Sequence, residues 1–91
     1  MSRYDSVWDA IEDRPQQAAV MRLRSQLMQA IERYAQALDA PPGAIAGTLQ
    51  IAEARLDDIL AGRIETFSLD ELAEIAVRAG LQVTLEIRDA A

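Results

Sequence analysis

The chain of 91 residues contains neither cysteine nor histidine, and these two absences exclude several kinds of site. Without cysteine there is no disulfide, no thiol nucleophile and no cysteine-based zinc site. Without histidine, the chain lacks the side chain used most often as a general base and as a metal ligand. We therefore expect no catalytic residues, no metal site and no cofactor, and we predict that the protein is not an enzyme.

Aromatic residues are scarce, at 4%, although hydrophobic residues make up 51% of the chain and charged residues 26%. This composition indicates one small folded domain, residues 1–91, with an aliphatic core. No apolar run approaches the ~18 residues of a membrane span, and the N-terminus lacks the pattern of a signal peptide. We therefore expect no membrane partner and a cytoplasmic location.

Lysine is also absent, so all nine basic residues are arginine, against 15 acidic residues and a net charge of −6. A DNA-binding domain usually has a basic surface, because contacts with phosphates supply most of its non-specific affinity. A local basic patch can still suffice. The charge therefore lowers the expectation of DNA binding without excluding it.

The most informative stretch is residues 40–64, which has the pattern of two short helices joined by a tight turn. Apolar residues at helical spacing predict helices over 42–49 and 52–61, with Gln50 in the turn and Gly62 as the stop. This arrangement is typical of a helix-turn-helix, whose second helix enters the DNA major groove. The pattern predicts the architecture more firmly than the function, because a fold can host many functions.

Further helices are predicted on both sides of this unit. Apolar spacing predicts a short helix over 4–12 and a long helix over 14–38. A last helix over 68–79 begins with Ser68, which has the capping-box partner Glu71 three residues later. The predicted fold class is mainly α: a helix-turn-helix bundle of about five helices with a C-terminal β-strand.

That strand is predicted over 81–88, where apolar and polar residues alternate; the apolar positions are Leu81, Val83, Leu85 and Ile87. A lone strand is unstable because its backbone groups stay unpaired. Pairing with the same strand of a second copy is the simplest solution, so we predict a homodimer with these four residues at its interface. Two alternatives are pairing with residues 1–4 and pairing with a strand of a partner protein.

Several blocks of sequence carry a resemblance to a known family; they are SVWDAIEDRP at 6–15, RLRSQLM at 22–28, ILAGRIETFSLDELAEIAVRAGL at 59–81 and the closing strand. They are similar to small Cro/XRE-type helix-turn-helix proteins, most of all to antitoxins of the host-inhibition-of-growth type. The resemblance implies a lambda-repressor-like fold and a transcriptional regulator that binds operator DNA and a cognate toxin protein. The chain departs from the family pattern at four positions of the helix-turn-helix: Pro42, Gln50, Ala52 and Glu53.

The second short helix and the residue after Gly62 supply the predicted DNA-binding residues, which are Glu53, Ala54, Arg55, Asp57 and Arg63. Arg55 is the best candidate for a base or phosphate contact, and Arg63 for a phosphate contact. Glu53 can accept a hydrogen bond from the amino group of cytosine.

The acidic residues of this unit oppose that function. Residues 40–65 hold two arginines and four acids, a net charge of −2. A carboxylate near a phosphate costs about 1 kcal/mol at ~4 Å even in a water-like dielectric. The alternative hypothesis is therefore a degenerate helix-turn-helix that binds other proteins and has little or no affinity for double-stranded DNA.

Overall fold

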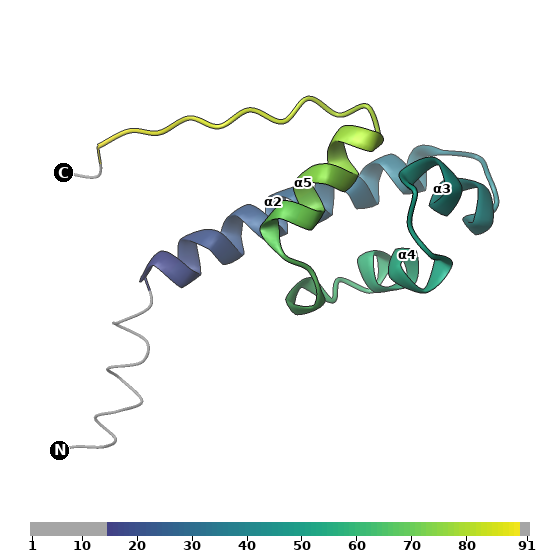
Figure 1. Ribbon diagram of the computed structural model, residues 1–91, viewed down its shortest axis with the longest axis horizontal. Helices are drawn as coiled ribbons and strands as arrows, with labels where there is room; N and C mark the ends of the chain where they lie inside the picture. Colours follow the sequence, from purple (N-terminus) through teal and green to yellow (C-terminus); the bar gives the residue numbers. More distant parts are fainter. Residues whose placement is uncertain (1–14, 90–91) are drawn as a thin grey trace, which may run out of the picture.

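The computed structural model describes residues 15–89, and helices dominate this part of the chain (Figure 1). Its elements are α2 (Pro15–Ala37), α3 (Pro42–Leu49), α4 (Glu53–Leu60), the short 3₁₀ helix η1 (Ile64–Thr66) and α5 (Leu69–Arg78). Each of the four α-helices agrees with its predicted range to within one residue at either end. The helix predicted over 4–12 lies outside the described residues, so the predicted total of about five helices is not confirmed. No described helix is long and apolar enough to cross a membrane.

The core lies where the three shorter helices meet the C-terminal half of α2. Every α-helix contributes to it, and the largest fully buried side chains are Ile31, Leu49, Leu56, Ile59 and Leu72. Burial of one such side chain contributes about 1.5–3 kcal/mol. The predicted aliphatic core is confirmed with one addition, since Phe67 is buried as well. This core fixes α3 and α4 against α2 and α5.

The turn between α3 and α4 has the geometry that the sequence predicts for a helix-turn-helix. Gln50 adopts a left-handed conformation, with φ 59° and ψ 44°, and its backbone N–H donates to the carbonyl oxygens at the end of α3. The next residue, Ile51, packs half-buried against the core and its N–H donates to the oxygen of Ala46 at 3.0 Å. The angle between the two short helices is therefore set by backbone hydrogen bonds and by the packing of the Ile51 side chain.

The predicted start of α5 is confirmed in detail. The N–H of Glu71 donates to the Ser68 hydroxyl oxygen at 3.0 Å, and the N–H of Ser68 donates to Oε1 of Glu71 at 3.0 Å. These two bonds satisfy backbone groups that a helix N-terminus leaves without partners. After the end of α5, Gly80 adopts a left-handed conformation, with a φ of 83°.

The C-terminal segment differs from its prediction. Residues 81–89 have no regular secondary structure, and Figure 1 shows them as an extended segment leading away from the end of α5. No backbone hydrogen bond joins residues 82–89 to any other described segment, so the strand over 81–88 is not confirmed. Leu81 packs half-buried against the core, whereas Val83, Leu85 and Ile87 are 44%, 72% and 83% exposed. A single chain thus leaves most of the predicted apolar face uncovered.

Candidate nucleic-acid interface

The exposed surface of helix α4 carries acidic side chains and one small one. Glu53, Ala54 and Asp57 are exposed, and Leu60 is 40% exposed, whereas Leu56 and Ile59 on the opposite side are fully buried. Three of the five predicted DNA-binding residues, Glu53, Ala54 and Asp57, therefore lie together on the outward side of the helix.

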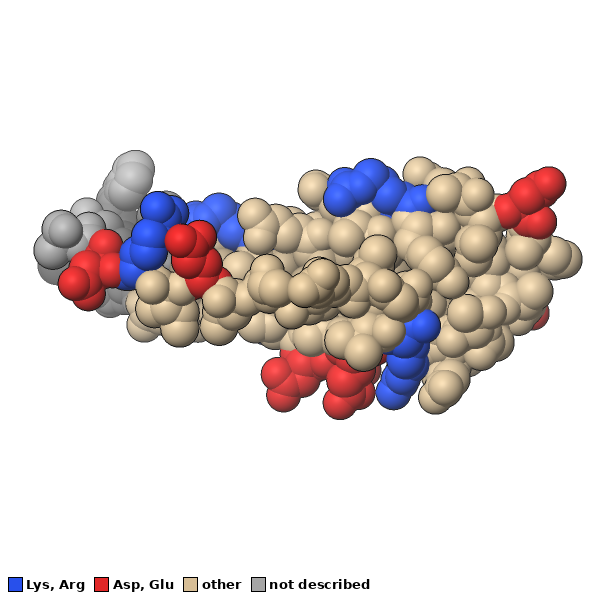
Figure 2. Space-filling view, turned by 90° about the horizontal axis from the view of Figure 1, so that it is seen from above, with Lys and Arg blue, Asp and Glu red and all other residues tan. Residues whose placement is uncertain are grey.

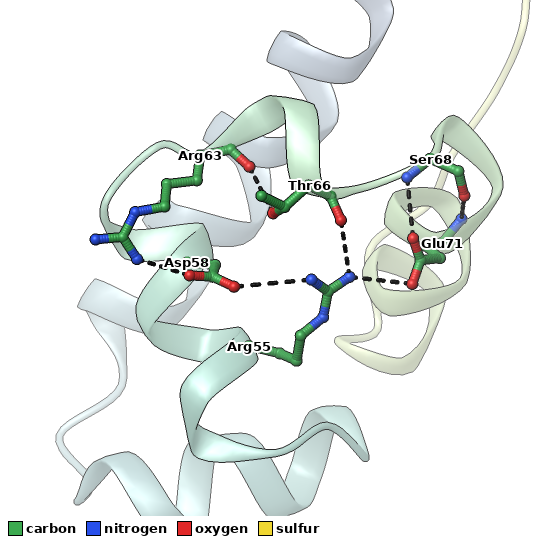
Figure 3. A network of polar contacts seen from close by, with 6 residues as sticks. All are labelled: Arg55, Asp58, Arg63, Thr66, Ser68 and Glu71. Atoms are coloured by element: carbon green, nitrogen blue, oxygen red, sulfur yellow. Dashed lines mark hydrogen bonds and ion pairs between the residues drawn. The ribbon is translucent and has the colours of Figure 1, made fainter.

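Arg55 does not belong to this outward surface, because its guanidinium lies between α4 and α5 (Figure 3). Its central carbon is 3.9 Å from the centroid of the Phe67 ring. Its Nη2 donates to the backbone oxygen of Thr66 and to Oε2 of Glu71, both at 3.1 Å. Its side chain is only 32% exposed. Arg55 therefore holds α4 against the loop and the first turn of α5.

Glu71 serves both the cap of α5 and the contact with Arg55. Oε1 accepts from the backbone of Ser68, while Oε2 accepts from the guanidinium of Arg55. The pKa of Glu71 is lowered from its ordinary value, chiefly by the hydrogen bond from the Ser68 backbone. Arg55 and the Ser68 hydroxyl lower this pKa further, whereas desolvation of the carboxylate raises it. Glu71 thus stays ionised to a lower pH than an ordinary glutamate.

Arg63 forms the closest ion pair of this region, since its Nη1 donates to Oδ1 of Asp58 at 2.7 Å. The other oxygen of Asp58 lies 3.7 Å from Nη1 of Arg55, so one carboxylate is shared by two arginines (Figure 3). Arg63 is 57% exposed, which leaves it within reach of an external partner. Both arginines of the predicted site are therefore paired with acids in the free chain.

The carboxylate of Glu53 lies against the first turn of α3. A Cβ atom at Gly43 would come within 2.9 Å of Oε2 of Glu53, so the absence of a side chain at Gly43 makes room for this carboxylate. Helix α3 has no side-chain cap of its own. A negative charge near a helix N-terminus is favourable, because the N-terminal end of the helix dipole is positive. Glu53 therefore contacts both helices of the unit.

The exposed surface of α3 beside Glu53 is small and uncharged; its residues are Pro42, Gly43, Ala44, Gly47 and Thr48. The exposed surface of α3 and α4 together includes acids but no arginine. Phe67 and Glu71 were not predicted as part of the site, and only the Ser68–Glu71 spacing indicated a fixed position for Glu71. Within residues 15–89, no cluster of three or more acidic side chains is arranged to hold a metal ion.

A family model described as a helix-turn-helix domain matches residues 10–88. The match contains α2 to α5 in full, and the chain belongs to this helix-turn-helix domain family. No curated protein matches the chain. The family agrees with the α3–turn–α4 geometry described above.

Proposed function

We propose that the protein is an antitoxin-like transcriptional regulator of the Cro/XRE type, which acts in the cytoplasm and binds operator DNA and a cognate toxin. The observation that carries the proposal is the helix-turn-helix match over residues 10–88 together with the α3–α4 arrangement. The sequence blocks around this unit resemble host-inhibition-of-growth antitoxins, which supports the more specific role.

In this proposal α4 enters the major groove and α3 lies across the phosphate backbone, as in other helix-turn-helix proteins. Arg63 lies three residues after the end of α4 and is the exposed basic residue nearest to it in the chain. On DNA, the guanidinium of Arg63 leaves the carboxylate of Asp58 and pairs with a phosphate. Because few arginines are available, the affinity for DNA should fall with salt along a shallow slope.

A homodimer is part of the proposal, because the two recognition helices of a dimer bind two DNA half-sites about 34 Å apart. The exposed side chains of Val83, Leu85 and Ile87 give the C-terminal segment an apolar face. A groove of about 500 Å³ lies between this segment, α2 and α5. Seen from the side of this segment, the molecule is mainly uncharged over its middle (Figure 2). Antiparallel pairing of two segments would cover part of this surface, and a toxin strand is the other occupant to be tested.

Fluorescence anisotropy tests the DNA-binding proposal. The full chain is titrated against a labelled duplex of its own upstream region at several salt concentrations, with a scrambled duplex of the same composition as the control. We expect binding to the upstream duplex that weakens moderately as salt rises. Absence of binding to either duplex at low salt would rule out the operator-binding function.

A second candidate function is a protein-binding module with little or no affinity for DNA. The observation that favours it is the exposed surface of α4, where Glu53 and Asp57 are charged and no basic side chain accompanies them. Asp57→Ser separates the two functions, because it removes one exposed negative charge and leaves the pairing of Asp58 intact. If DNA binding is the function, Asp57→Ser should raise the affinity. If the protein is a protein-binding module, neither the wild type nor Asp57→Ser should bind DNA.

A further inference from the structure

The exposed surface of α4 has no side chain of the types that usually read purines. Guanine is read mostly by arginine or lysine, and adenine by asparagine or glutamine. The one arginine of the helix, Arg55, is held against Phe67 and Glu71. What remains on the outward side at the start of the helix is an acceptor at Glu53 and a methyl group at Ala54.

Both kinds of group match pyrimidines in the major groove. Cytosine presents an amino donor at N4, which a carboxylate accepts, and thymine presents a methyl group, which an alanine contacts. We infer, on the basis of the operator-binding function proposed above, that α4 reads its half-site through pyrimidines. Glu53 accepts from the amino group of a cytosine, Ala54 packs against the methyl group of a thymine, and no guanine is contacted by α4.

The position of these two residues supports this assignment. They are the first two residues of α4, and the N-terminal residues of a recognition helix are those that contact base edges. The carboxylate of Glu53 lies at the start of α3, where Gly43 has no side chain that would compete with it for space.

The small residues of α3 add to this support. Gly43, Ala44 and Gly47 are exposed and carry at most one methyl group each, so the surface beside Glu53 has no long side chain that would hold the DNA away. The same geometry discriminates against guanine. Guanine presents two acceptors, N7 and O6, to the groove, and a carboxylate opposite them has no donor to offer.

Selection from a random duplex library tests the inference with three full-length proteins: wild type, Glu53→Gln and Glu65→Gln. Glu65 is an exposed acid in η1, so its variant loses the same charge outside α4. We expect the wild type and Glu65→Gln to select a cytosine at one position of each half-site. Glu53→Gln should select adenine there, because glutamine pairs with adenine, with a change in relative affinity of at least about fivefold.

Uracil substitution tests the contact of Ala54 in the same selected site. Replacement of the contacted thymine by uracil removes only the methyl group and should weaken binding about fourfold, as expected for one buried methyl group. Guanine at the selected position, or an unchanged preference in Glu53→Gln, would overturn the inference while leaving the operator-binding function intact. Absence of any selected sequence, with no binding at low salt, would overturn both.

Discussion

Replacement of Arg55 by alanine should destabilise the fold much more than replacement of Arg63 by alanine. Arg55→Ala removes the stacking on Phe67, two hydrogen bonds to Thr66 and Glu71, and a longer contact with Asp58. A cation–π contact contributes about 0.5–2 kcal/mol and a hydrogen bond about 1 kcal/mol. Since the side chain is 32% exposed, solvent screening reduces the total, and we expect a loss of roughly 2 kcal/mol.

Arg63→Ala is the matched control. It removes a shorter ion pair, at 2.7 Å, but Arg63 is 57% exposed and stacks on no described aromatic ring. Exposed ion pairs contribute about 0–1 kcal/mol. For a domain of this size, 1 kcal/mol corresponds to about 4–8 °C in Tm. Arg55→Ala should therefore lower Tm by roughly 8–16 °C, and Arg63→Ala by less than about 8 °C.

Circular dichroism during thermal unfolding at pH 7 measures this difference, and Arg55→Lys completes the series. Lysine keeps the charge but lacks the planar fork that stacks on Phe67 and bonds to two oxygens at once, so it should recover less than half of the loss. Equal Tm values for wild type and Arg55→Ala would refute the structural role of Arg55. Arg55 would then again be a candidate for reading bases.

Three further predictions concern other parts of the fold. The ionised form of Glu71 is favoured in the folded state, because the pKa of this carboxyl is lowered there. Its contribution to stability is therefore present above the ordinary pKa of a glutamate and is lost as the pH falls through the lowered pKa. Glu71→Gln should flatten the decrease in Tm between about pH 5 and pH 3. Ala52→Ser supplies the side-chain cap that α4 lacks and should raise the free energy of unfolding by about 1 kcal/mol in urea titrations, and no gain would contradict the proposed helix start. Leu85→Asp places a charge on the exposed apolar face of the C-terminal segment and should convert a dimer into a monomer in light scattering, whereas a monomeric wild type at tens of micromolar would refute self-pairing.

The sequence predicted best the features that depend on local signals. Gln50 forms the turn between α3 and α4, Gly62 follows the end of α4, and Ser68 and Glu71 begin α5; each of these residues acts through others at most a few positions away. The predicted ranges of the four described α-helices were therefore correct to within one residue at either end.

The role of Arg55 could not be predicted in the same way. Its partners Phe67 and Glu71 lie 12 and 16 positions further along the chain, and only the packed core brings them together. The strand over 81–88 depends on a second segment, and none of the described residues provides one. Local pattern thus predicted the four described α-helices, whereas the side-chain contacts between them required the structure.

The two carboxylate oxygens of Glu71 link the first turn of α5 to the side chain of Arg55 on α4. Because Oε1 of Glu71 closes the first turn of α5 and Oε2 binds Arg55 of α4, we expect fraying of that turn to release Arg55 as well. Segments joined in this way open as one cooperative unit in hydrogen exchange. The amides of the first turn of α5 and those of α4 should therefore exchange with the same opening free energy, and Ser68→Ala should lower it for both. We therefore expect the rigidity of α4 to depend partly on Ser68, which belongs to a different element.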